Sequence, residues 1–570
     1  MTCLIFGKED LKVTRMNRRK INIVPYVILF ILILFVNGKM RAQEIIHLFP
    51  DRSFAVSGDT VWFSIFIYSD DSNETSEVVH VQLDDLANNH VSKVSILCSG
   101  KTGEGYIHIP DSLSTGIYVL KPFSLVQKIS GKGVINQKLI TVYNRFDNET
   151  GVIEEPDGIK LKRYDINKEV VITTGKEQYE KGENVNVEIR IPGTGIDQYK
   201  KVFAFAGLAD PFSQRFLSGW IPSSTIAKTE NPVMLTEKNG ILISGKVVSN
   251  ETDVPVANAI VLLSIPDTIP FFDYCISDSA GEFYFYLRNA TGVANLVIQA
   301  LSQNEEKCKI KLSYSFIEVG SIPATQKILT LEETKFIGNI IKASYYSKLF
   351  KGYKIGTPDN FMLPMQFKYP FYGPPTKTYY PDLFVDLPDF REISREILHG
   401  VQYRERKGGT TIRLQNQSIS ALFSQEPLRL LDGIPVFDNK IFAPMGTNDI
   451  KKVDVVFYKR FYGDLTFNGV LSVYTKNKSL DWVDLKPGIG HFEYSCLQLA
   501  KRFEFMNGRV PDTHVPNLNK VLFRTTVKEI KSQIDFNFFT SDIKGDVEIN
   551  VILIDKNNHI SYAHKFIDVK

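Results

Sequence analysis

Apolar and polar residues alternate along most of the chain that follows residue 43. In the stretch 60–69, Val61, Phe63, Ile65 and Ile67 occupy every second position. This period of two predicts β-strands that bury one face. Turn residues interrupt such strands at intervals of roughly eight to twelve positions, which is the spacing of β-sandwich domains. We therefore expect a mainly β protein built from tandem β-sandwiches.

Two segments depart from this alternation. Residues 331–350 carry apolar side chains at helical spacing, for example Phe336 and Ile340. A second helix is predicted to start after Asp389, a residue that caps helix N-termini, and to stop at Gly400. These two helices should be exceptions in a chain of strands.

A stretch rich in Pro and Tyr lies between the two helices and shows no period. Because Pro removes backbone donors and stiffens the chain, 328–384 is predicted to contain a helix followed by an extended connector. Its aromatic residues either pack on neighbouring domains or stack on a sugar or a peptide. The aromatic residues in question are Tyr369, Phe371, Tyr372, Tyr379 and Tyr380.

The N-terminal segment 1–42 has the features of a secretory signal. Basic residues precede a short apolar run, Ile21–Val36, and the small residue Ala42 follows it. We expect export with cleavage near Ala42 or Gln43, although an uncleaved anchor helix is an alternative. No later apolar run is long enough to cross a membrane as a helix. The predicted location is the periplasm or the outer membrane, where peripheral association with the membrane is an option.

Three segments resemble known β-sandwich domains. Residues 43–147 contain "FAVSGDTVWF" and "IPDSLSTGIY" and resemble a macroglobulin-like domain. Residues 148–238 contain "YEKGENVNVEIRI", which predicts a second sandwich. Residues 239–327 resemble a carboxypeptidase regulatory-like domain, in which Gly281 marks a hairpin turn that needs positive φ. Domains of this last type carry no peptidase chemistry of their own.

The segment 427–442, "PLRLLDGIPVFDNKIF", predicts two short strands joined by a tight turn at Asp432-Gly433. Together with "DIKKVDVVFYKRFYGDLTFNGVLSVYTK" (449–476), it makes 385–478 similar to the plug domain of TonB-dependent receptors. Pro435 lacks an amide donor, so the second strand should lie at a sheet edge or a bend. The predicted interaction residues, with structural and not catalytic roles, are Leu428, Leu430, Asp432, Gly433, Ile434, Pro435 and Val436.

The remaining residues, 479–570, predict a C-terminal β segment. They are too few for a receptor barrel, whose strands each need roughly 9 to 11 residues. The domain order therefore resembles a family of exported envelope proteins that combine macroglobulin-like, regulatory-like and plug-like domains but lack a barrel.

Charge and motifs give little indication of chemistry. Lys and Arg number 67 against 64 Asp and Glu, a net charge of +3, so no cationic surplus is available for nucleic acid. The common hydrolase, zinc-protease, phosphate-loop and calcium-loop motifs are missing. Ser541 and Lys544 match an isolated S-x-x-K, without its partner motifs. The acidic loop 70–77 is more simply a solvated turn than a calcium site. We predict no catalytic residue, no cofactor and no metal site.

Cysteines are few and scattered. Cys98 lacks the Glu-Gln neighbours that a macroglobulin thioester requires. With Cys275, Cys308 and Cys496 it could form two disulfides after export, but buried free thiols are the favoured interpretation. Cys3 falls in the predicted signal.

These observations predict a non-enzymatic interaction scaffold of the cell envelope. Sandwich edges and the hairpin would offer main-chain groups for strand addition by a partner, either an outer-membrane barrel or another envelope protein. The alternative is a surface module that binds carbohydrate or peptide through the connector aromatics.

Overall fold

The computed structural model describes most of the chain beyond the predicted export signal. The described residues are 4–5, 44–69, 75–130, 134–147, 152–192, 197–213, 215–223, 237–267, 269–302, 307–313, 316–351, 362, 368–406, 409–478, 480–484, 488–499, 503 and 516–570. The predicted signal 1–42, apart from Leu4–Ile5 (β1), and most of the acidic loop 70–77 lie outside these residues. Strands dominate the described chain, which confirms the mainly β prediction.

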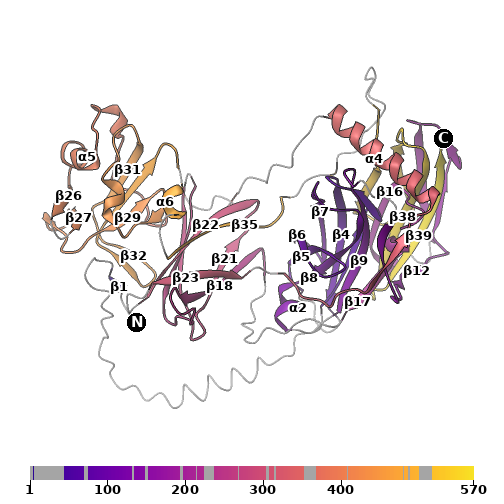
Figure 1. Ribbon diagram of the computed structural model, residues 1–570, viewed down its shortest axis with the longest axis horizontal. Helices are drawn as coiled ribbons and strands as arrows, with labels where there is room; N and C mark the ends of the chain where they lie inside the picture. Colours follow the sequence, from indigo (N-terminus) through magenta and orange to yellow (C-terminus); the bar gives the residue numbers. More distant parts are fainter. Residues whose placement is uncertain are drawn as a thin grey trace, which may run out of the picture. The chain divides into compact units, whose positions relative to one another are not determined.

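The chain divides into two compact units that interleave in sequence. Unit 1 comprises 1–39, 242–314 and 360–494, and unit 2 comprises 40–241, 315–359 and 495–570. The predicted connector 328–384 is therefore shared between the two units. In unit 2, residues 199–208 from the middle of the chain pair with residues 547–555 near its end (Figure 1).

The first sandwich of unit 2 is formed by one large sheet with the order β6-β5-β8-β9-β2-β4-β7. Its inward side chains are apolar and almost completely buried, as the alternation in the sequence predicts. Its strands are β2 (Glu44–Pro50), β4 (Thr60–Ser69), β5 (Val78–Asp85), β6 (His90–Leu97), β7 (Thr102–His108), β8 (Gly116–Phe123) and β9 (Val134–Tyr143). Short additions to this sheet are β3 (Phe54–Val56), β11 (Lys162–Arg163) and β17 (Gly219–Ser223).

The second sandwich of unit 2 combines the middle of the chain with its C-terminal part. One sheet has the order β12-β39-β38-β16-β36, with β14 beside β39, and the other has the order β13-β15-β37. The strands are β12 (Asp165–Ile166), β13 (Val171–Thr174), β14 (Gln178–Tyr179), β15 (Asn184–Arg190), β16 (Tyr199–Leu208), β36 (Val521–Val527), β37 (Gln533–Phe539), β38 (Gly545–Asp555) and β39 (Ile560–Val569).

This arrangement corrects two predicted boundaries. The segments 148–238 and 479–570 were expected to be separate modules, but β16 pairs with β38 along one side and with β36 along the other. The physical reason is that the second half of β16 is buried on both faces, so it needs a sheet partner at each edge. Those partners lie far away in sequence.

Helices and a two-stranded ribbon complete unit 2. Helix α4 (Leu331–Lys351) confirms the predicted helix, and its buried Ile337 and Ile340 pack against Phe54 in one cluster. The ribbon pairs β10 (Val152–Pro156) with β24 (Ala324–Ile328). Two short helices are α2 (Leu125–Ser130) and α3 (Arg215–Ser218). In the described part of the chain, no helix is long and apolar enough to cross a membrane.

Unit 1 contains the third sandwich, with sheets β21-β18-β23 and β20-β19-β22-β35. Gly281 has φ +73° in a turn, as the sequence predicts. The last strand, β35, follows residue 479, so the predicted C-terminal segment also contributes to this domain. The strands are β18 (Gly240–Ser249), β19 (Ile260–Ile265), β20 (Phe271–Ile276), β21 (Glu282–Arg288), β22 (Val293–Leu301), β23 (Cys308–Ser313) and β35 (Ile489–Ser495).

The part of unit 1 that spans 377–484 contains a five-stranded sheet with the order β25-β31-β34-β29-β30. Asp389 caps α5 by accepting a hydrogen bond from the Glu392 amide at 2.8 Å, which confirms the predicted helix start. Two three-stranded sheets, β26-β27-β28 and β1-β33-β32, accompany it. Its elements are β25 (Lys377–Tyr379), η2 (Pro381–Leu383), α5 (Phe390–Glu396), β26 (Val401–Arg406), β27 (Gly409–Asn416), β28 (Ala421–Leu422), β29 (Leu428–Leu431), β30 (Ile434–Pro435), η3 (Asn439–Phe442), β31 (Ile450–Val456), β32 (Arg460–Tyr462), β33 (Leu465–Phe467), β34 (Val470–Thr475) and α6 (Asp481–Asp484).

Candidate functional site

The predicted hairpin forms as β29 and β30, and all seven of its predicted residues are buried. Leu428 and Leu430 pack in one cluster with Ile260 of β19, in the neighbouring sandwich of unit 1. Ile434 packs in another cluster with Val297 of β22. The hairpin thus has the packing role that its apolar side chains predict, and it contributes to the core that joins these two parts of unit 1.

The main chain of the hairpin is also engaged. Pro435 lies on β30, the last strand of its sheet, as its missing donor predicts. The buried Gln299 side chain donates a hydrogen bond to the Pro435 carbonyl at 3.0 Å. The Asp432 carboxylate accepts from the amide and the hydroxyl of Thr475 at 2.8 and 2.7 Å. The hairpin is therefore not the open edge for a partner that the sequence suggests, because its apolar side chains bury it against β19 and β22.

The chain at the opposite side of the same sheet exposes apolar side chains instead of burying them. Among the described strands, β25 is the terminal strand there and pairs with β31. The chain then turns through η2 and exposes three consecutive apolar side chains: Leu383 is 79%, Phe384 58% and Val385 78% exposed. We call Leu383–Val385 the apolar run. Three adjacent exposed apolar residues are unusual on a folded surface unless they bind something.

Polar contacts fix both ends of the apolar run. Before it, the Asp382 carboxylate lies 3.7 Å from the Lys476 ammonium. After it, the Asp386 carboxylate accepts hydrogen bonds from the Thr447 hydroxyl and the Asn448 amide group, both at 3.0 Å. These contacts hold the run, which follows β25 along the chain, in place while its side chains contact solvent. In the sequence, the run is "LFV" between two Asp residues in a Pro-rich stretch, a pattern that indicates no more than a connector.

The connector aromatics do not form one exposed platform. Tyr372 and Tyr379 are buried, and their hydroxyls bond to Tyr474 and to the His399 carbonyl respectively. Phe371 stacks on a sandwich residue, Phe272, with ring centroids 4.2 Å apart. Tyr369 and Tyr380 are 42% and 48% exposed. The arrangement therefore removes most of the ring surface that a sugar- or peptide-stacking site would use.

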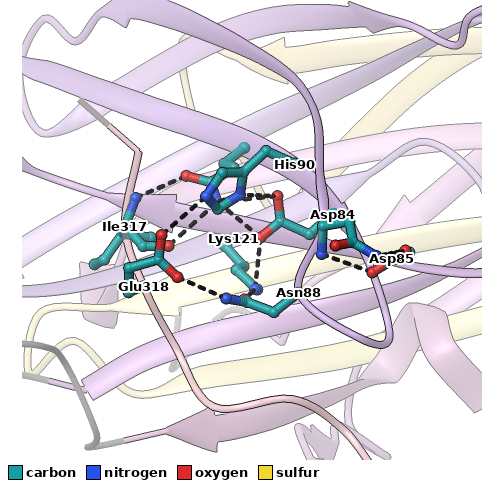
Figure 2. Close-up of polar contacts among 9 residues, drawn as sticks. Asp84, Asp85, Asn88, His90, Lys121, Ile317 and Glu318 are labelled. Carbon is teal, nitrogen blue, oxygen red and sulfur yellow. Dashed lines mark hydrogen bonds and ion pairs between the residues drawn. The ribbon is translucent and has the colours of Figure 1, made fainter. Parts of the chain in front are cut away.

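Unit 2 contains a dense cluster of ionisable side chains that the sequence did not reveal. Figure 2 shows His90 of β6 between the carboxylates of Asp84 and Glu318, at 3.0 and 3.1 Å. The Lys121 ammonium of β8 lies 2.6 Å from Asp84 and also donates to the Asn88 side chain. Lys121, a buried charge in an otherwise apolar strand, is the one sequence feature that could have indicated this cluster.

The cluster fastens the segment that begins at Phe316 to the first sandwich. The Ile317 amide donates to the Gln82 side chain at 2.8 Å, and Gln82 in turn donates to the Ile317 carbonyl at 3.2 Å. Ile317 itself is buried with Phe123, while the Phe316 ring stacks on His90 at 4.5 Å. Partial burial lowers the pKa of His90, but its hydrogen bonds to Asp84 and Glu318 outweigh that effect and raise the pKa overall. We refer to this arrangement as the His90 latch.

A second histidine forms an arrangement that resembles a catalytic triad. The Ser95 hydroxyl lies 2.8 Å from Nδ1 of His80, and the Glu237 carboxylate lies 2.8 Å from Nε2. All three residues are almost completely buried, and burial lowers the pKa of His80. The Ser95 carbonyl also accepts from the Gln498 amide at 2.7 Å. Since a substrate needs access to the serine, we assign these contacts a structural role.

The other residues considered as candidates for chemistry also have structural roles. Ser541 is buried and its hydroxyl lies in a turn with Ile543, at 3.3 Å from the Ile543 amide, which is a packing role. Burial raises the pKa of the Cys98 thiol to about 12, far from the reactive range. Within the described residues, no three His, Cys, Asp or Glu side chains gather as a metal site. Across the ranges that the structure describes, the thiols of Cys98, Cys275 and Cys496 form no disulfide, and Cys308 is buried.

Comparison with known proteins identifies no family. No family model matches the chain, and no curated protein matches it. Among solved structures, Salmonella α2-macroglobulin reacted with methylamine is 8% identical over 93% of this chain and 40% of that chain, with a TM-score of 0.24. Trypsin-activated α2-macroglobulin from Escherichia coli is 9% identical over 93% of this chain and 42% of that one, with a TM-score of 0.23.

A tetra-tandem repeat from the extending region of a large adhesion protein is 8% identical over 92% of this chain and 99% of that chain, with a TM-score of 0.13. The chain spans about two fifths of the length of the macroglobulins it matches. Likenesses at these TM-scores carry no argument about the activity of this chain.

Proposed function

We propose that this chain is a non-enzymatic interaction scaffold of the cell envelope, which docks a partner at the β25 edge of unit 1. The observation that carries the proposal is the exposed apolar run that follows this terminal strand along the chain. The predicted export signal supports the envelope location. The partner is an outer-membrane barrel or another envelope protein that contributes a β-strand.

The β25 edge and the apolar run complement each other as a docking surface. A terminal strand has main-chain donors and acceptors on its outer side, which a partner strand pairs with during strand addition. Main-chain pairing alone carries little specificity, so a docking edge needs side-chain anchors as well. Leu383, Phe384 and Val385 supply them, and burying such side chains contributes about 1.5–3 kcal/mol each.

Site-specific photo-crosslinking in cells that express the full chain tests the proposal. A photoreactive residue at Phe384 should crosslink to one defined envelope protein. The same residue at Val254, an isolated apolar side chain of unit 1 that is 58% exposed, should not. The triple variant Leu383→Ser, Phe384→Ser, Val385→Ser should weaken the association at least about tenfold, whereas Val254→Ser should leave it unchanged.

The proposal fails if probes at both positions capture the same mixture of abundant proteins. It also fails if the triple variant retains the defined partner. Because all substituted side chains are exposed, thermal unfolding of the variants should match that of the unsubstituted protein.

A further inference from the structure

Unit 2 contains a cleft of about 520 Å³ beside β9 and α3, which the proposed docking function does not use. This volume lies within the range of small-molecule sites in proteins. The cleft is lined by Leu139, Pro156, Ile159, Lys160, Leu161, Arg163, Arg215 and Phe216.

Apolar side chains form the floor of the cleft. Leu139 and Phe216 are 3% and 2% exposed and belong to one apolar cluster of unit 2. Ile159 and Leu161 pack on that cluster but are only partly buried. A hydrocarbon chain laid on these side chains would lose its contact with water, which is favourable in proportion to the apolar area removed.

Among the described residues that line the cleft, every charged side chain is basic. These side chains are Lys160, Arg163 and Arg215. Arg215 already bonds to Glu155 and lies over the Phe216 ring. Within the described chain, the exposed side chains of Lys160 and Arg163 take part in no ion pair or hydrogen bond. Two cations are thus available beside an apolar floor.

We propose that this cleft binds a single-chain carboxylate amphiphile of the fatty-acid class. The hydrocarbon chain lies on the partly buried Ile159 and Leu161, and the carboxylate pairs with Lys160 and Arg163. Charge selects the class, because a neutral chain would leave both cations without a counterion and a cationic one would be repelled. An ammonium and a guanidinium both donate strong hydrogen bonds to a carboxylate.

Titration calorimetry of the full chain with decanoate, below its micelle concentration, tests this assignment. Decanoate should bind saturably at one site. Decan-1-ol, which lacks the charge, and butyrate, which lacks the chain, should each bind at least about tenfold more weakly. Saturable binding of butyrate with the affinity of decanoate would mean a simple anion site and would overturn the proposal.

Variants locate the site. The double substitution Lys160→Gln, Arg163→Gln should weaken decanoate binding about tenfold and leave decan-1-ol binding unchanged. The control Lys168→Gln, an exposed cation of the same unit outside the cleft lining, should change neither. Equal decanoate affinity in the double variant, or a lack of saturable decanoate binding to the unsubstituted protein, would overturn the proposal. Crosslinking at Phe384 reports on unit 1, so failure of either proposal is distinguishable from failure of the other.

Discussion

Gly433 combines two constraints at one position of the buried hairpin. It has φ +86°, and a Cβ atom there would lie 2.2 Å from Cβ of Pro270 in the adjacent sandwich. Gly373, in the same unit, has a similar φ of +80° but no atom within 4 Å of the corresponding position. A comparison of the two positions therefore separates the cost of backbone strain from the cost of steric contact.

Alanine substitutions at the two glycines should differ in cost. Gly373→Ala should destabilise unit 1 by about 1–2 kcal/mol, the cost of an L-residue in the left-handed region. Gly433→Ala should cost about 1–3 kcal/mol more, because Pro270 has to move. Amide hydrogen exchange of β29 under native conditions measures both free energies. Equal costs would show that the contact with Pro270 does not constrain the hairpin.

Local chemistry in the sequence predicted much of this part of the chain correctly. The cap at Asp389, the turn at Asp432-Gly433 and the edge position of Pro435 all follow from properties of single residues. The sequence could not show that Gln299 donates to the Pro435 carbonyl, because the two residues meet only after folding. The ion pair of Lys121 could not be predicted for the same reason, because its partner Asp84 lies on another strand.

Among the elements, the His90 latch has a defined response to pH. The His90 pKa is raised in the folded protein, so its protonated form stabilises the latch below the unfolded value of 6.5. That stabilisation is lost as the pH rises through the raised folded pKa. Lys121 adds a positive charge to the same cluster, and burial lowers the pKa of Lys93, whose ammonium lies over the Phe316 ring, to about 8.

The segment fastened by the latch should therefore exchange faster at higher pH. The Ile317 amide should be better protected at about pH 5.5 than at about pH 7.5, after correction for the intrinsic exchange rate. His90→Gln should remove most of this difference. His559→Gln removes another carboxylate-paired histidine of unit 2, which bonds to Asp165 at 2.8 Å, and should leave the difference intact. If protection of the Ile317 amide in the unsubstituted protein did not depend on pH, titration of His90 would not control the latch.

At the scale of the two units, the main finding is that neither is a continuous stretch of the sequence. Each unit is built from segments that alternate along the chain. Periodicity identified strands throughout 148–238 and 479–570, because alternation is a local property. It could not show that β16 takes its sheet partners from 521–555, since strand pairing depends on contacts between distant residues. Element type was therefore predictable, whereas the grouping of elements into sandwiches was not.

Deletion of 521–570 tests this interleaving. The truncated chain should lose the second sandwich, because the buried half of β16, Val202–Leu208, would lose sheet partners at both edges. A domain stable by only about 5–15 kcal/mol does not survive such a loss. Limited proteolysis should therefore cleave within 164–208, while β18–β23 of unit 1 stay resistant as an internal control. Resistance of 164–208 would instead support modules in linear order.

The interleaving of the two units also constrains how the polypeptide matures. A ribosome makes β16 before any residue of 242–314 or 360–494, and it makes β36 and β38 only afterwards. Throughout that interval β16 has both hydrogen-bonding edges unoccupied, and such edges readily pair with other chains. We therefore expect emerging molecules to depend on a holding chaperone until the C-terminal strands have left the ribosome or the export channel. Closure of the second sandwich should be the slow, late step of folding.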